Sequence, residues 1–230
     1  MRLVFMGKKT SKPLIIAIDG PAGSGKSTVS KIVAKRLALL YIDTGAMYRA
    51  LTLKAMRQGL DLEDEDALVS LAKSAKIGLE EKDKLRVFLD GEDVSLAIRT
   101  PDVTANVKYI ARVPGVRHEM VALQRSISQE HGGAILEGRD IGTVVFPNAD
   151  YKFYLDASPE ERARRRCKEL IESGETASEI SVKEDILTRD DSDMKRSVGA
   201  LKKCDDAIFI DTTGLSIDGV TEKILNYICA

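Results

Sequence analysis

The strongest chemical signature in this sequence runs from Gly20 to Ser27 and reads Gly-Pro-Ala-Gly-Ser-Gly-Lys-Ser. Closely spaced glycines let the backbone fold around an anion, so that successive N–H groups and the start of a following helix face a phosphate. In such a loop Lys26 reaches the terminal phosphates of a nucleotide, and the Ser27 hydroxyl suits Mg²⁺. The segment predicts a nucleotide phosphate site. The alternative is a glycine-rich turn between a strand and a helix with a structural role only.

Acidic residues and arginines follow two further apolar runs, which we predict to be strands. Open α/β sheets bind their ligands at the carboxyl ends of their strands, so these residues would lie at a ligand site. Asp43 and Arg49 follow one run, and Arg139 and Asp140 follow the other. Switches, motors and kinases all use a loop like that at Gly20, but the sequence has no Asn-Lys-x-Asp segment that would read guanine. An enzyme that phosphorylates a phosphorylated acceptor must neutralise two phosphate chains, so several arginines should converge on one cleft.

Two other charged clusters have two interpretations each. Arg189, Asp193 and Arg196 are spaced i, i+4 and i+7, which places them on one helix face. Such a stripe is usually a solvated row of ion pairs, and the alternative is a contribution to the phosphate site. The run Arg164–Arg166 precedes a connection that contains Gly174. It is either a solvated helix face or a lid that is mobile without ligands and closes over them.

The elements that position these residues alternate between strand and helix, which predicts a parallel sheet flanked by helices. Residues 77–98 break this alternation, because apolar and polar residues alternate there and Asp90-Gly91 signals a hairpin turn, so we expect a small antiparallel insert. Strands are predicted at 14–18, 41–42, 134–137, 151–155 and 207–210. Helices are predicted at 26–39, 46–58, 63–75 and 216–228. Further helices should begin at Thr100-Pro101, after Pro114, and at the capping segments that start with Ser158 and Ser181.

Composition excludes several classes of protein. Of the 230 residues 43% are hydrophobic and 31% are charged, which argues against a membrane protein and against wholesale disorder. The net charge of −1 lacks the global signature of a nucleic-acid binder. Cys167, Cys204 and Cys229 are dispersed and form no Cys/His cluster for zinc. Residues 1–12 are expected to be a frayed tail, and the expected compartment is cytoplasmic.

Taken together and in this order, the motifs resemble those of the bacterial cytidylate kinase family, a family of P-loop nucleoside monophosphate kinases, over residues 13–228. Many families share the phosphate-binding loop, but the Gly138–Pro147 segment combined with the others is close to diagnostic. The resemblance implies an α/β fold with a parallel sheet flanked by helices, a small antiparallel insert and a helical lid. The segments that carry it are Ile18–Ser27, Asp43–Arg49, Gly91–Ser95 with Ile98–Thr100, Gly138–Pro147 and Arg189–Asp193.

The resemblance also implies a division of the chain. It implies one kinase domain over residues 1–230, with these sub-regions: 13–45 for the loop and the start of the core, 46–115 for acceptor binding with the insert at 77–98, 116–161 for the core, 162–180 for the lid, and 181–230 for the rest of the core.

Site residues are implied by the same resemblance. Catalysis is expected from Lys26, Arg139, Arg189 and Asp43, although a strand-end Asp also caps turns. Ser27 is the expected Mg²⁺ ligand. At position 108, where relatives commonly have Ser for a base contact, this chain has Lys108, which can donate but not accept. The ATP site would comprise Gly20, Pro21, Ala22, Gly23, Ser24, Gly25, Lys26, Ser27, Thr28, Arg165 and Arg166; the CMP site Thr44, Arg49, Arg117, Arg139, Asp140, Arg189, Asp193 and Arg196.

The expected reaction is phosphoryl transfer from ATP to CMP or dCMP, giving ADP and CDP or dCDP. Its expected partners are these small molecules with Mg²⁺, without nucleic acid or membrane, and the expected state is a monomer. One alternative is a P-loop kinase for another small acceptor, such as shikimate or dephospho-coenzyme A. The other is a nucleotide-dependent switch, which would hydrolyse ATP slowly whatever acceptor is added.

Overall fold

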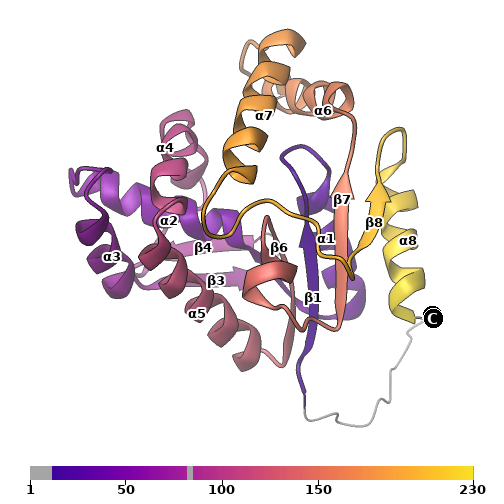
Figure 1. The fold of residues 1–230 in the computed structure, drawn as a ribbon, viewed down its shortest axis with the longest axis horizontal. Helices are drawn as coiled ribbons and strands as arrows, with labels where there is room; N and C mark the ends of the chain where they lie inside the picture. The colour runs from indigo at the N-terminus through magenta and orange to yellow at the C-terminus, as the bar shows by residue number, and fades with distance from the viewer. Residues whose placement is uncertain (1–11, 82–84, 173, 230) are drawn as a thin grey trace.

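The structure, a computed structural model, describes residues 12–81, 85–172 and 174–229. Of the predicted tail, residues 1–11 lie outside these ranges, as do residues 82–84 of the predicted insert and residue 173 of the predicted lid. The fold divides into a central sheet with helices on both faces, a small second sheet, and a pair of helices at one edge (Figure 1).

A five-stranded sheet forms the centre, with strand order β2-β6-β1-β7-β8 and every neighbouring pair parallel, as predicted. Its middle strand is the continuous apolar run after Pro13, which suits a strand covered on both faces. Because all five strands run the same way, their carboxyl ends meet at one edge. The strands are β1 (Leu14–Asp19), β2 (Leu40–Asp43), β6 (Gly133–Gly138), β7 (Tyr151–Asp156) and β8 (Ile208–Asp211).

Alternate residues of β1 enter different hydrophobic layers. Ile15 and Ala17 pack in a cluster with residues of α2 (Thr44–Arg57), α3 (Glu65–Ser74) and α5 (Pro114–Glu130), whereas Ile16 and Ile18 face α1 (Lys26–Leu37) and α8 (Ile217–Cys229). Burying one such side chain contributes about 1.5–3 kcal/mol. The two layers therefore fix the sheet from both faces.

The predicted insert is present as an antiparallel sheet that packs against α2. Asp90 and Gly91 both have positive φ (50° and 90°), as a two-residue hairpin turn of the primed type requires. The short helix η1 (Ala97–Arg99) and α4 (Pro101–Ala111) return the chain to α5, and the Thr100 side chain caps α4 as predicted. The strands are β3 (Ile77–Glu81), β4 (Leu85–Leu89) and β5 (Glu92–Asp93).

Helices α6 (Pro159–Glu172) and α7 (Glu179–Met194) form a hairpin above the carboxyl edge of the sheet (Figure 1). It has a small core of its own, made by Ala163, Cys167, Val182 and Ile186. Within the described ranges, no helix is long and apolar enough to cross a membrane.

Three local predictions for this hairpin were wrong. Helix α7 begins at Glu179 with Ser178 in the N-cap position, three residues before the cap expected at Ser181. It ends at Met194, so Arg196 lies beyond the helix and not on a shared helix face. At Ser158 half of the expected capping box forms. The Glu161 N–H donates to Ser158 Oγ at 3.2 Å, but the Glu161 carboxylate pairs with arginines of α6.

Candidate active site

The carboxyl ends of the five strands bring together segments that are far apart in the sequence. The glycine-rich loop follows β1, Thr44 follows β2, and Arg139 follows β6; α6 begins shortly after β7, and Thr212 follows β8. The sheet therefore collects the predicted charged residues and the phosphate-binding loop on one edge, where open parallel sheets bind ligands.

The loop leaves backbone donors free at the start of α1. Gly25 is the N-cap residue, with φ 87°, and no side chain caps this end of the helix. Gly20 has φ 146°, and a Cβ atom added there would lie 2.0 Å from the carbonyl oxygen of Leu155, so the position admits only glycine. The first N–H groups of a helix without a side-chain cap are a ready anion site.

Lys26 lies buried inside this loop. Its Nζ atom donates to the Pro21 carbonyl oxygen at 2.6 Å and to Ser24 Oγ at 3.3 Å. Burial, and next the positive charge of Arg139, lower the pKa of Lys26 to about 7. The side chain is thus folded back on its own loop, and its charge is sensitive to what lies beside it.

Glu137, at the end of β6, connects the loop to the neighbouring strands. Ser27 Oγ donates to Glu137 Oε2 at 2.9 Å, and the Tyr41 hydroxyl donates to the other oxygen. Burial and the nearby Asp43 carboxylate raise the pKa of Glu137. The sequence analysis did not assign Glu137 to the site, although its place at the end of an apolar strand was a usable signal.

A hydroxyl beside a carboxylate is a donor set that suits Mg²⁺, which in phosphate sites takes one or two carboxylates and completes its coordination with water and phosphate oxygens. Ser27 and Glu137 therefore fit this ion. The described residues contain no group of three or more His, Cys, Asp or Glu side chains able to hold a metal. A magnesium ion shared with bound phosphates does not need such a group.

Two arginines pair with the Asp193 carboxylate, and a third, Arg189, lies near it. Arg139 Nε donates to Asp193 Oδ2 at 2.8 Å, and Arg196 pairs with the other Asp193 oxygen. These cations hold the pKa of Asp193 below its usual value although burial opposes them. Within the described residues, the Arg189 side chain makes no hydrogen bond or ion pair, and burial together with Arg139 lowers its pKa to about 10. The cluster of Arg139, Arg189, Arg196 and Asp193 therefore carries excess positive charge, as an anion site does.

Arg49 and Asp43 border this cluster. One oxygen of Asp43 accepts the Ala46 N–H at 2.8 Å and caps α2, while the other lies 3.4 Å from Arg49 Nη2 and 3.8 Å from Arg99 Nη2. Asp43 therefore caps a helix and forms ion pairs. A capping role of this kind was the alternative that the sequence analysis gave to a catalytic role for Asp43. Arg49 is one of the charges that lower the pKa of Arg189, so the two are near neighbours.

Arg117 and Asp140 form a buried ion pair beside the cluster. Arg117 Nη1 also donates to the Ala111 carbonyl oxygen at 3.1 Å, and its guanidinium lies 5.3 Å from the centre of the Tyr48 ring. Asp140 thus pairs with Arg117 and not with its chain neighbour Arg139. The predicted acceptor residues Thr44, Arg49, Arg117, Arg139, Asp140, Arg189, Asp193 and Arg196 lie at one end of the sheet.

Two other predicted side chains point elsewhere. Lys108 is exposed on α4, with its ammonium 5.0 Å from the centre of the Tyr109 ring. Arg166 is exposed and pairs with Glu169 at 3.0 Å, whereas Arg165 donates to the Thr212 hydroxyl at 3.0 Å and to its carbonyl at 2.7 Å. Thr212 in turn donates to the Ser24 carbonyl oxygen at 3.1 Å. Arg165 is therefore linked to the glycine-rich loop through Thr212, whereas Arg166 faces solvent.

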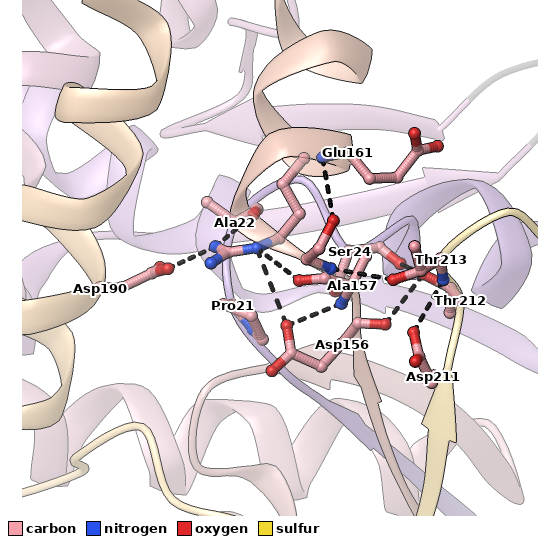
Figure 2. A network of polar contacts seen from close by, with 12 residues as sticks. Pro21, Ala22, Ser24, Asp156, Ala157, Glu161, Asp190, Asp211, Thr212 and Thr213 are labelled. Atoms are coloured by element: carbon pink, nitrogen blue, oxygen red, sulfur yellow. Dashed lines mark hydrogen bonds and ion pairs between the residues drawn. The ribbon is translucent and has the colours of Figure 1, made fainter. Parts of the chain in front are cut away.

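Arg162, to which the sequence analysis assigned no role in the site, connects α6 to α7 and to the loop at Gly20; Figure 2 labels its partners Ala22, Ala157 and Asp190. Its Nη1 atom donates to the Ala22 carbonyl oxygen at 3.2 Å and pairs with Asp190 of α7, while Nε donates to the Ala157 carbonyl oxygen at 3.1 Å. The side chain is buried, and Asp156 at the end of β7 lies 3.8 Å away. Arg162 thus fastens both helices of the hairpin to the phosphate-binding loop.

Comparison with known proteins decides the family. A model of the cytidylate kinase family matches residues 16–230. This chain belongs to the cytidylate kinase family. It is 52% identical over 214 residues to the cytidylate kinase of Geobacillus sp. strain WCH70, covering 93% of this chain and 95% of the relative. It is 51% identical over 213 residues to that of Desulforamulus reducens, covering 93% and 96%.

Solved structures add agreement on the fold. An uncharacterized protein from Eubacterium ventriosum superposes with a TM-score of 0.55 at 15% identity, covering 95% of this chain and 99% of that protein. At this identity the likeness concerns the fold alone. The family membership and the parallel sheet with helices on both faces confirm the fold class and the family resemblance drawn from the sequence.

Anion binding at Lys26 should depend on pH in this cytidylate kinase family member. The free chain loses the ammonium as pH rises through about 7. A polyphosphate beside Nζ favours the charged form, so above that pH binding takes up a proton and weakens as pH rises. Calorimetric titration with tripolyphosphate at about pH 8, in two buffers that differ in ionisation enthalpy, should show this uptake. A Lys26→Met variant isolates the contribution of Lys26; identical proton uptake by the two proteins would contradict the assignment.

Arg162 should matter more to stability than any other arginine of α6. Arg162→Met leaves the buried Asp190 carboxylate unpaired, which we expect to lower the free energy of unfolding in urea by about 3 kcal/mol. Arg166→Met, one turn further along the same helix, removes only an exposed pair and should cost less than about 1 kcal/mol. Replacing Asp190 by Asn in the Arg162→Met protein should recover part of the loss. Equal losses for the two single variants would show that the buried network is not what holds the hairpin.

Proposed function

We propose that the chain transfers a phosphoryl group from ATP to CMP or dCMP, giving ADP and CDP or dCDP. The observation that carries this proposal is the arginine cluster around Asp193, which stands beside the phosphate-binding loop. Arg139 and Arg189 are close enough to Lys26 to lower its pKa, so the two anion sites adjoin. Donor and acceptor phosphates bound there would meet across a short gap, as in-line transfer requires.

The donor side rests on the loop from Gly20 to Thr28. Its free N–H groups would bind the phosphate chain of ATP, and Lys26 would leave the Pro21 carbonyl to contact the terminal phosphates. Ser27 and Glu137 would hold Mg²⁺, which when bound neutralises charge on the phosphate oxygens. Arg165 already lies beside the loop and would contact ATP, with α6 forming part of the lid that excludes water.

The acceptor side rests on the arginines. Arg139 and Arg189 would bind the phosphate of CMP together with Arg49, and Asp193 with Arg189 would reach the ribose. Because transfer needs little covalent chemistry from the protein, these residues act by positioning and by neutralising charge. Asp43 would direct Arg49 toward the phosphate, since both its oxygens are engaged in the cap and in ion pairs.

The buried Arg117–Asp140 pair supports cytosine as the base. Cytosine presents an exocyclic amino donor where uracil presents a carbonyl acceptor, and a carboxylate favours the donor. Asp140 would accept from that amino group, while Arg117, Arg196 and Thr44 supply donors for the acceptor atoms of the ring. A site of buried polar groups rejects a base that leaves them unpaired.

The arginine cluster also weighs against the alternatives. An acceptor with a single carboxylate and no phosphate, such as shikimate, would neutralise less of the charge of Arg139, Arg189 and Arg196 than a nucleoside monophosphate does. A nucleotide switch needs no second anion site. A switch therefore leaves the arginine cluster unexplained, and shikimate neutralises it only in part; dephospho-coenzyme A, which carries phosphates, is not disfavoured by this charge argument.

The deciding experiment measures ADP release with a panel of acceptors: CMP, dCMP, UMP, AMP, GMP and shikimate. We expect rapid release that depends on the acceptor and is fastest with CMP or dCMP. Slow ATP hydrolysis that no acceptor stimulates would indicate a switch. Stimulation by shikimate in place of the monophosphates would overturn the nucleotide assignment.

Asp140 should control the choice of base. We expect kcat/KM for CMP to exceed that for UMP by at least about tenfold, from roughly 1–3 kcal/mol of discrimination by the carboxylate. Asp140→Ala should lose more activity with CMP than with UMP and so narrow the ratio. Asp140→Asn should narrow it too, because its amide can donate to the uracil carbonyl. A CMP/UMP ratio that stays constant through both changes would remove Asp140 from base selection.

A further inference from the structure

Asp19, the last residue of β1, has a buried carboxylate that the reaction as proposed does not use. Its two oxygens accept the backbone N–H groups of Ile141 and Gly142, each at 2.8 Å. These residues begin η2 (Ile141–Val145), a turn of π-helix that follows directly after Asp140. The carboxylate thus spans from the start of the phosphate-binding loop to the turn behind the acceptor site.

This turn has no cap from its own segment. Asp140 occupies the N-cap position with φ −145° and ψ 25°, and its side chain makes no capping bond because it is turned to Arg117. Free N–H groups at a helix start need an acceptor, and a carboxylate is a strong one. Asp19 supplies that acceptor from a different strand.

The turn has little freedom to adopt another arrangement around Asp19. A Cβ atom added at Gly142 would lie 2.9 Å from Cys204 Sγ and 3.4 Å from Asp19 Oδ2, so backbone and carboxylate are in close contact. Gly138 is equally confined, since an added Cβ would lie 2.7 Å from Ile141 Cδ1. Between these two glycines lie Arg139 and Asp140, whose side chains go to Asp193 and Arg117. Their directions depend on how the turn is held.

We propose that Asp19 is a positioning residue for acceptor recognition: by holding η2 through two N–H bonds, it directs Asp140 toward the base and Arg139 toward the acceptor phosphate. The proposal rests on the proposed function, because it takes Asp140 as the residue that reads the base. Two other roles are possible for a carboxylate at this position. It could stabilise the fold only, or it could act on the donor side through the charge of Lys26, which it faces within the same loop region.

Asp19→Asn separates these roles. The amide oxygen still accepts one N–H, but the amide NH₂ then faces the second N–H, so the turn loses one of its two bonds. A misplacement of reacting groups by a fraction of an ångström to 1 Å can cost up to about a hundredfold, and we expect KM for CMP to rise about tenfold. The CMP/UMP ratio of kcat/KM should narrow, while KM for ATP should change by less than about threefold.

The matched control is Asp150→Asn. Asp150 contacts the opposite end of β1, where its carboxylate accepts the Ile15 N–H at 2.8 Å, and it lies far from the acceptor residues in the fold. Asp19 is buried whereas Asp150 is exposed, so the melting temperature of each variant is measured beside its kinetics to separate a loss of stability from a change in selectivity. We expect only Asp19→Asn to change the CMP/UMP ratio.

A double variant tests whether Asp19 acts through Asp140. In the Asp140→Ala protein, adding Asp19→Asn should leave the CMP/UMP ratio where it is, because the residue that reads the base is already gone. If Asp19→Asn fails to fold, Gly142→Ala strains the same turn without changing any charge and should narrow the ratio in its place.

The proposal is overturned if the CMP/UMP ratio of kcat/KM is unchanged in Asp19→Asn or, where that variant does not fold, in Gly142→Ala. It is also overturned if Asp19→Asn raises KM for ATP while the selectivity for CMP persists, because its effect would then lie at Lys26. The activity of the wild-type chain distinguishes failure of the proposed function from failure of the positioning role of Asp19. If it does not phosphorylate CMP, the proposed function fails; if it does and the Asp19 variant keeps its selectivity, only the positioning role fails.

Discussion

Mutual repulsion among cations at the carboxyl edge of the sheet is the constraint on which the rest of this structure depends. Burial and Arg139 lower the pKa of Lys26 to about 7, and the same two causes lower the pKa of Arg189 to about 10. Without an anion between them, these groups destabilise the folded chain. In the proposed reaction an arriving phosphate would relieve the repulsion, so the site would be arranged for its ligand before the ligand binds. Sites that violate a local rule of stability in this way are usually functional ones.

The fold offsets part of this repulsion because three of the cations at this edge have a polar partner, although the Arg189 side chain has none among the described residues. Lys26 is held by the Pro21 carbonyl, Arg139 by Asp193 and Arg117 by Asp140. The free energy that maintains these positions comes from elsewhere, from the two apolar layers on either face of the sheet. Strand ends move little once both layers are packed, and this is why a parallel sheet can carry a charged edge.

Much of the fold followed from the sequence, since periodicity locates strands and helices. The glycine-rich loop was predicted from its own residues, whereas the roles of the acceptor-site residues came from the family resemblance and stay predictions. What the sequence did not predict depends on partners far away in the chain. Arg162 stands in a run of arginines on a polar helix, and only the docking of α6 decides that it is buried against Asp190 while Arg166 stays in solvent. Glu137 was predicted only as the end of a strand, and Asp19 received no role, because the acceptors that they provide serve residues of other elements.

Arg196 shows how a predicted contact can be right for a different reason. Spacing placed it on a helix face with Asp193, yet α7 ends at Met194 and the contact forms across the helix end. The same helix carries two neighbouring residues with different partners. Asp190 pairs with Arg162 and so with the phosphate-binding loop, whereas Arg189 lies among the arginines around Asp193. Because successive residues of a helix point about 100° apart, α7 belongs to both sites at once. If ATP and CMP bind as proposed, a displacement of α7 toward either phosphate would therefore move residues of the other site as well.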